Sequence, residues 1–161
     1  MLNLTLERIE RQIRNLPVEH AYALDANYSI LCHVTDNLPN EVRFSQAQLE
    51  SLQGAILTHN HPGGRSLSRP DVLLARRWNL DEIRAVTATQ RYAVKPPLAG
   101  WSLKDDFEAV LDQERVLLNT LMDREIERGA LTGWMAERTF HQRLWERIAS
   151  RGLLRYTAEK W

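Results

Sequence analysis

The feature that most constrains the fold is a short apolar run, from Gly54 to His59, that leads directly into a loop rich in turn-forming residues. The run has the length and composition of a buried strand, and the loop that follows it contains a proline and two adjacent glycines. Beyond the loop, Ser68 and Asp71 are three residues apart with Pro70 between them, which is typical of a helix N-terminus. A strand, a tight loop and a helix in this order predict a sheet covered by a helix.

Strand-like and helix-like patterns are mixed through residues 1–100. We expect a helix over 4–16, strands over 18–25, 29–34, 41–45, 54–59, 82–88 and 91–95, and further helices over 47–52 and 71–79. The remainder has helical spacing, with one helix presenting apolar residues from Phe107 to Met122 and a second carrying Trp134 to Ile148. The pattern predicts an α/β (α+β) fold with a sheet flanked by helices. We expect a core over residues 1–100, and over 101–161 a C-terminal helical extension that packs on the same domain.

Composition narrows the functional classes. The chain has 161 residues, 43% of them hydrophobic, and a formal net charge of +0, so nucleic acid is not an expected partner. Cys32 is the only cysteine, which excludes an internal disulfide and favours a reducing compartment. Because no signal-peptide pattern and no run of membrane-span length is present, we expect a cytoplasmic protein without a membrane partner.

The residues with the clearest chemistry are His59, His61 and Asp71. On an extended strand, residues two apart point to the same face, so both imidazoles can bind one metal ion. Asp71, in the first turn of the next helix, can turn back as a third ligand. Two imidazoles and one carboxylate leave a fourth position open, as in a catalytic zinc site. This ligand set favours Zn²⁺ at one ion per chain, with Mn²⁺ or Fe²⁺ as alternatives.

These residues resemble the motif of the JAMM (MPN-type) metallopeptidases, in which His-x-His-Pro is followed by a loop and Ser-x-x-Asp. Here the two parts are HNHP at 59–62 and SRPD at 68–71, and the form is similar to the bacterial and phage branches that include RadC-like proteins. The resemblance covers about residues 18–95. The loop between the two parts is one residue shorter than in the commonest family form, which bears on the placement of Ser68. The resemblance does not explain the C-terminal helices.

The resemblance implies a JAMM-like mixed sheet and a glutamate on an earlier strand. Glu19 starts the first core strand and is the favoured candidate over Glu41, which stands closer to the histidines in sequence. The glutamates on predicted helices have better explanations as solvated residues; these are Glu7, Glu10 and Glu50.

In the family's mechanism, Glu19 would act as general base and then general acid on a metal-activated water. Ser68 would help the metal to stabilise the oxyanion. Asn60 would point to the opposite face and fix the loop.

Three functions follow as hypotheses. The first is a zinc peptidase or isopeptidase acting on a protein or peptide, with a ubiquitin-like conjugate or a phage- or toxin-associated protein as candidate substrates. The second is an inactive scaffold that binds a partner through its C-terminal helices, and the third is a RadC-like DNA-associated role.

Other chemically notable residues have structural explanations. Cys32 and His20 fit structural positions in strands, His33 and His141 are isolated, and Trp134 and Trp145 suit a core or a homo-oligomer contact.

Overall fold

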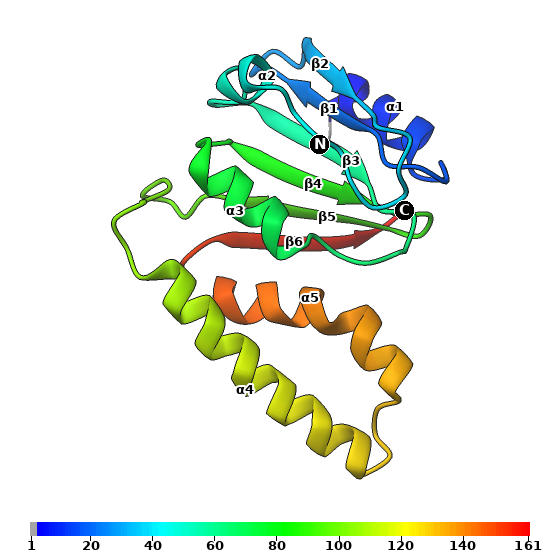
Figure 1. Cartoon of the computed structure of the whole chain (residues 1–161), viewed down its shortest axis with the longest axis vertical. Helices are drawn as coiled ribbons and strands as arrows, with labels where there is room; N and C mark the ends of the chain where they lie inside the picture. The colour runs from blue at the N-terminus through cyan, green and yellow to red at the C-terminus, as the bar shows by residue number, and fades with distance from the viewer. Residues whose placement is uncertain (1–2) are drawn as a thin grey trace.

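The computed structural model describes residues 3–161, which form a six-stranded mixed sheet flanked by five helices (Figure 1). The predicted α/β (α+β) class is therefore confirmed. The elements in chain order are α1 (Leu4–Ile13), β1 (Ala21–Leu24), β2 (Ile30–Val34), α2 (Gln46–Glu50), β3 (Ile56–Asn60), α3 (Arg69–Arg77), β4 (Glu82–Val86), β5 (Gln90–Lys95), α4 (Phe107–Glu127), α5 (Gly133–Ser150) and β6 (Arg155–Lys160).

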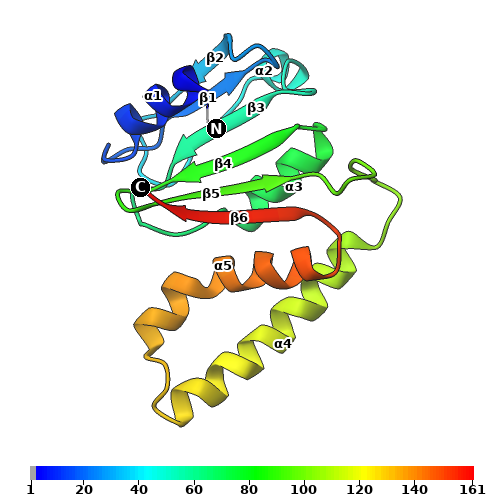
Figure 2. The same ribbon diagram turned by 180° about the vertical axis from the view of Figure 1, so that it is seen from behind.

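The strand order of the sheet is β2-β1-β3-β4-β5-β6, and β3 and β4 form its parallel pair while the other neighbours are antiparallel. α1 lies on one face of the sheet and α3 on the other, as the two opposite views show (Figures 1 and 2). β3 is buried along its whole length, and successive side chains alternate between the faces. Leu57 belongs to the core on the α3 face, whereas Ile56 packs with α1.

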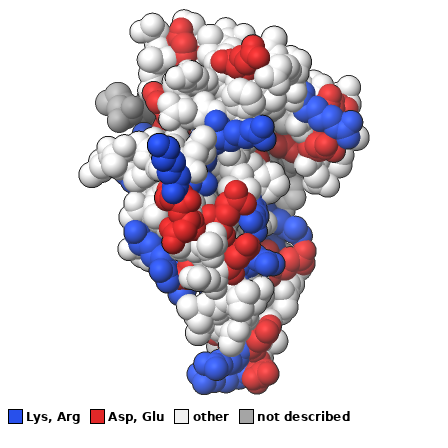
Figure 3. Space-filling model, turned by 60° about the vertical axis from the view of Figure 1, so that its left-hand side comes forward, with Lys and Arg blue, Asp and Glu red and all other residues white. Residues whose placement is uncertain are grey.

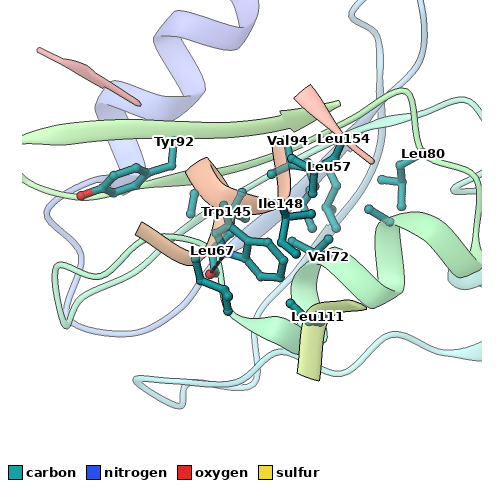
Figure 4. Packing of buried hydrophobic residues seen from close by; sticks show 14 of the residues in the cluster. Leu57, Leu67, Val72, Leu80, Tyr92, Val94, Leu111, Trp145, Ile148 and Leu154 are labelled. Atoms are coloured by element: carbon teal, nitrogen blue, oxygen red, sulfur yellow. Dashed lines mark hydrogen bonds between the residues drawn. The ribbon is translucent and has the colours of Figure 1, made fainter. Parts of the chain in front are cut away.

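The larger core fills the space between the sheet and helices α3, α4 and α5 (Figure 4). Trp145 of α5 is fully buried there, and its Nε1 donates a hydrogen bond to the Leu67 carbonyl at 2.7 Å. A smaller core lies under α1, where Leu6, Ile9 and Ile13 pack against residues of β3 and β4. Burial of these apolar side chains is the main force that holds the helices on the sheet.

The C-terminal region differs from the sequence-based expectation. Residues 101–154 contain the expected helix pair, α4 and α5, but residues 155–160 form β6, which pairs antiparallel with β5. The helical assignment was wrong there because β6 is an exposed edge strand, so no alternation of apolar residues marks it. Trp134 is 66% exposed, so the core interpretation holds for Trp145 and fails for Trp134.

Two further expectations were wrong. Residues 41–45 form an irregular loop and no strand; the alternation of Val42 and Phe44 arises because both pack against the core from that loop. Glu10 is fully buried and not solvated, since its carboxylate accepts hydrogen bonds from Arg84 on β4 and Thr58 on β3. Its charge is compensated by the arginine, which the helical pattern of α1 does not reveal.

The surface carries charges of both signs. In the face shown in Figure 3, acidic and basic side chains are intermingled, in keeping with the formal net charge of +0. Among the helices of residues 3–161, none is both long enough and apolar enough to cross a bilayer.

Candidate metal centre

The site begins at the end of β3, where His59 and His61 point to the same face. Their Nε2 atoms are 2.8 Å apart and the two rings are inclined at 74°. His59 is 2% exposed, and β3 continues below it into the core through Leu57. The extended backbone therefore brings the two imidazoles together as the spacing predicted.

The orientation of His61 is fixed by the loop that follows it. The Nδ1 atom of His61 lies 3.0 Å from the Arg65 carbonyl oxygen, which can only accept, so Nδ1 donates and Nε2 keeps its lone pair. The loop turns at Gly64, whose φ of 74° is in the left-handed region and whose N–H donates to the His61 carbonyl at 3.0 Å. A lone pair on Nε2 is what a metal ligand requires.

Asp71 enters the site from the first turn of α3. Ser68 caps this helix: the Asp71 N–H donates to its hydroxyl, and its own N–H donates to Asp71 Oδ2 at 2.6 Å. The Ser68 hydroxyl donates to the same oxygen at 2.7 Å. In this orientation Oδ1 lies 3.4 Å from His59 Nε2, and Oδ2 lies 3.5 Å from His61 Nε2. The cap thus directs the carboxylate at both imidazoles.

Glu19 reaches the same point from the segment just before β1, which begins at Ala21 and not at Glu19 as expected. Ala21 pairs with His59, and the strands are antiparallel, so Glu19 lies at the end of the sheet where the histidines lie. Its Oε1 is 3.7 Å from His59 Nε2, and Glu19 is 5% exposed. Glu41, the alternative, is exposed and pairs with Arg43.

Asn60 lies on the opposite face of β3, as expected, and it fixes the approach to β1. Its Oδ1 accepts from the His20 N–H at 2.7 Å, and its Nδ2 donates to the carbonyls of Leu16 and Val18 at 3.2 and 3.0 Å. These three hydrogen bonds hold the segment that carries Glu19 against β3.

The proximity of these groups shifts their pKa values. Burial raises the pKa of Glu19 to about 7, although the neighbouring His59 opposes the rise. Burial alone would lower the pKa of His59, but the carboxylates of Asp71 and Glu19 raise it above its usual value. Burial and the nearby His59 lower the pKa of His61 to about 4. For Asp71, burial raises the pKa, but the two histidines and the Ser68 hydroxyl hold it well below its usual range.

The donor set fits a divalent cation. Glu19, His59 and His61 each offer a ligand atom, these atoms all lie within 4.8 Å of one another, and the Asp71 carboxylate contacts both histidines. Two carboxylates and the Nε2 atoms of two imidazoles therefore meet at one point, and a cation bound there would compensate the buried carboxylates. Nitrogen and oxygen ligands of this kind suit zinc and related divalent ions. The group can therefore hold a metal ion.

Two cavities open from this centre, and Glu19, Ser68 and Asp71 line both. One, of about 410 Å³, runs between the sheet and α3 and is mainly apolar. The other, of about 500 Å³, runs along the loop after β3 to His141 of α5. His141 is therefore not isolated as expected, and no motif in the sequence marks it, because α5 reaches the site only in the folded chain.

The remaining predicted residues lie away from the centre. His20 Nδ1 is 3.0 Å from His33 Nε2, and the two rings are stacked, so each has a structural neighbour. Cys32 is a free, half-buried thiol on β2 that packs against the larger core. These contacts agree with structural roles for all three side chains.

Among known proteins, no protein-family model matches this chain, and no curated protein resembles it at a significant level.

Proposed function

We propose that this chain is a zinc-dependent peptidase or isopeptidase of the JAMM type, acting in the cytoplasm. The observation that carries the proposal is the convergence of Glu19 with His59, His61 and Asp71 at the junction of two cavities, with Ser68 beside them. The motif spacing in the sequence supports the same conclusion. Perturbed pKa values in a cleft are also typical of catalytic sites.

In this proposal His59, His61 and Asp71 hold the ion. A divalent ion bound there would supply Lewis acidity, lowering the pKa of a bound water and polarising the substrate carbonyl. Glu19 is buried, and its Oε1 lies 3.7 Å from His59 Nε2, so its carboxylate is placed to accept a proton from a water molecule held at the centre. It takes a proton from water as the water oxygen attacks the carbonyl carbon. It then delivers that proton to the leaving nitrogen as the carbon–nitrogen bond breaks.

Ser68 has a second task in this proposal. Its hydroxyl proton is directed at Asp71, and rotation about the Cβ–Oγ bond turns the proton toward a substrate oxygen. A donor aimed at a developing oxyanion contributes about 3 kcal/mol to transition-state stabilisation. The substrate is a protein or peptide lying across the junction of the two cavities, and a ubiquitin-like conjugate is one candidate.

The test compares Glu19→Gln with Glu41→Gln, its matched control. Both glutamates line the apolar cavity, but Glu41 is exposed, pairs with Arg43 and is not one of the residues whose ligand atoms converge. We expect Glu19→Gln to reduce hydrolysis of a peptide library by at least about 10²-fold while zinc is retained, and Glu41→Gln to keep both. Product formation is followed by mass spectrometry, and zinc by metal analysis.

The outcomes separate the alternatives. Unchanged cleavage by Glu19→Gln shows that the base is misassigned. Loss of zinc from Glu19→Gln shows that Glu19 is a zinc ligand and not only a base. A parent protein that takes up no zinc contradicts the proposal and favours the partner-binding scaffold.

A further inference from the structure

The apolar cavity beside the metal centre carries information on the substrate. Its floor and walls come from three parts of the fold: the sheet, the loop before α2, and α3. The residues concerned are Ala21, Leu57 and Ile83 on the floor, and Val42, Phe44 and Leu74 on the walls.

The wall residues pack against the core but stay partly exposed to solvent. The floor residues are buried in the core, whereas Val42, Phe44 and Leu74 are only half-buried. The cavity of about 410 Å³ is thus bounded by apolar surface that water still reaches. An apolar group that displaces this water gains free energy in proportion to the area covered.

The charges around the cavity define what it excludes. Glu19, Glu41 and Asp71 are its charged lining residues among those described, and neither lysine nor arginine lines it. An acidic side chain would meet the Glu41 carboxylate on the side away from the metal centre, and a glycine would leave the cavity filled with water. A bulky apolar side chain suits the half-buried walls, whereas a charged side chain of either sign would lose hydration against Val42, Phe44 and Leu74.

Because the cavity shares Glu19, His59 and Asp71 with the metal centre, its occupant lies next to the reacting atoms. We infer that the cavity is a specificity pocket, and that the chain selects peptide substrates with a large aliphatic or aromatic residue next to the scissile bond. This inference rests on the proposed function and names the substrate class for that site.

The test uses amino-acid hydroxamates, which combine a metal-binding group with one side chain. Leucine, glycine and aspartate hydroxamates are titrated into the zinc-loaded protein by calorimetry. We expect leucine hydroxamate to bind at least about tenfold more tightly than the glycine compound, because a hydrophobic pocket discriminates by that order for small apolar groups. The aspartate compound is expected to bind no more tightly than glycine hydroxamate.

Tryptophan substitutions inside and outside the cavity test whether the leucine preference arises there. Val42→Trp, or Leu74→Trp from the other wall, fills the cavity, and each is expected to reduce the leucine preference to below about threefold with glycine hydroxamate binding kept. Arg43→Trp places the same side chain next in sequence, at a position that is largely exposed and does not line the cavity. This control is expected to keep the preference.

A cleavage assay separates this inference from the proposed function. Peptide pairs that differ in leucine or glycine next to the scissile bond are incubated with the zinc-loaded parent. A leucine preference in binding without cleavage of any peptide supports the pocket and contradicts the peptidase proposal. Cleavage together with equal binding of leucine and glycine hydroxamates contradicts the specificity pocket and supports the peptidase proposal. Failure to load zinc contradicts both.

Discussion

At the scale of single residues, Ser68 combines a structural and a chemical task. It caps α3 through a pair of reciprocal hydrogen bonds with Asp71, and its hydroxyl holds the Asp71 carboxylate toward the histidines. The chain contains a second serine in the same kind of cap, Ser45 at the start of α2, which does not line the two cavities of the metal centre. A comparison of the two serines therefore distinguishes the effect of losing a helix cap from the effect of losing a hydroxyl at the metal centre.

Ser68→Ala is expected to lower the free energy of unfolding by about 1 kcal/mol, the usual contribution of an N-cap. It is also expected to lower kcat for peptide hydrolysis by about 10²- to 10³-fold, because an oxyanion donor is lost. Ser45→Ala is expected to have a similar effect on stability and none on kcat. Urea denaturation and steady-state kinetics measure the two quantities. Full activity in Ser68→Ala would remove this serine from the mechanism.

The pH dependence of zinc binding follows from His59 and Glu19. In the metal-free protein the carboxylates of Asp71 and Glu19 raise the pKa of His59, and burial raises that of Glu19 to about 7, so the folded site favours protons on these two groups. Zinc displaces such protons, and its affinity therefore rises with pH until they are lost. We expect zinc affinity to rise between pH 6 and pH 8, by up to about tenfold per pH unit for each proton displaced. Competition with a chelator at several pH values measures this; an affinity that does not change from pH 6 to 8 would refute it.

At the scale of elements, α1 is anchored to the sheet by a buried charge. Glu10 accepts hydrogen bonds from Arg84 at the centre of β4, and Arg84 also bonds Glu82. A guanidinium buried without its main partner is costly, whereas an exposed pair contributes little.

Glu10→Ala is therefore expected to lower the free energy of unfolding by about 3 kcal/mol. Glu7→Ala, which removes the partly exposed partner of Arg11 on the same helix, is expected to change it by less than about 0.5 kcal/mol. Urea denaturation compares the two variants. Equal changes in the free energy of unfolding would show that the buried Glu10–Arg84 pair stabilises the fold no more than the partly exposed Glu7–Arg11 pair does.

The C-terminal elements hold the loop that follows β3. Trp145 of α5 donates to the Leu67 carbonyl at 2.7 Å, and the Tyr156 hydroxyl of β6 lies 2.8 Å from the Ser66 hydroxyl. Arg65 forms an ion pair with Glu137 of α5. The helix pair and the last strand thus fix the loop between His61 and Ser68, which is a role that their sequence alone does not indicate.

The elements that could be predicted are those with strong local signals. The buried run before His59, the turn at Pro62 and the cap at Ser68 each specify their own geometry, so β3 and the start of α3 follow from the sequence. β6 could not be predicted, because an edge strand buries little and needs β5 to form. The loop over 41–45 was misread because its apolar residues face the core without a strand partner.

At the scale of the whole molecule, the convergence at the metal centre depends on contacts distant in sequence. The His-x-His spacing predicted one pair of side chains, but the position of Glu19 is set by the pairing of β1 with β3 and by Asn60. His141 enters only through the packing of α5. Spacing along a strand or helix is visible in a sequence, whereas approach across a sheet is a property of the fold.

The most direct test of the metal centre is a crystal structure of the protein grown with zinc, with diffraction measured at the zinc absorption edge. We expect one anomalous peak per chain, about 2.0–2.2 Å from Nε2 of His59, Nε2 of His61 and a carboxylate oxygen of Asp71. Zinc supplied in excess with no peak between these three side chains, or with a peak elsewhere alone, would contradict it.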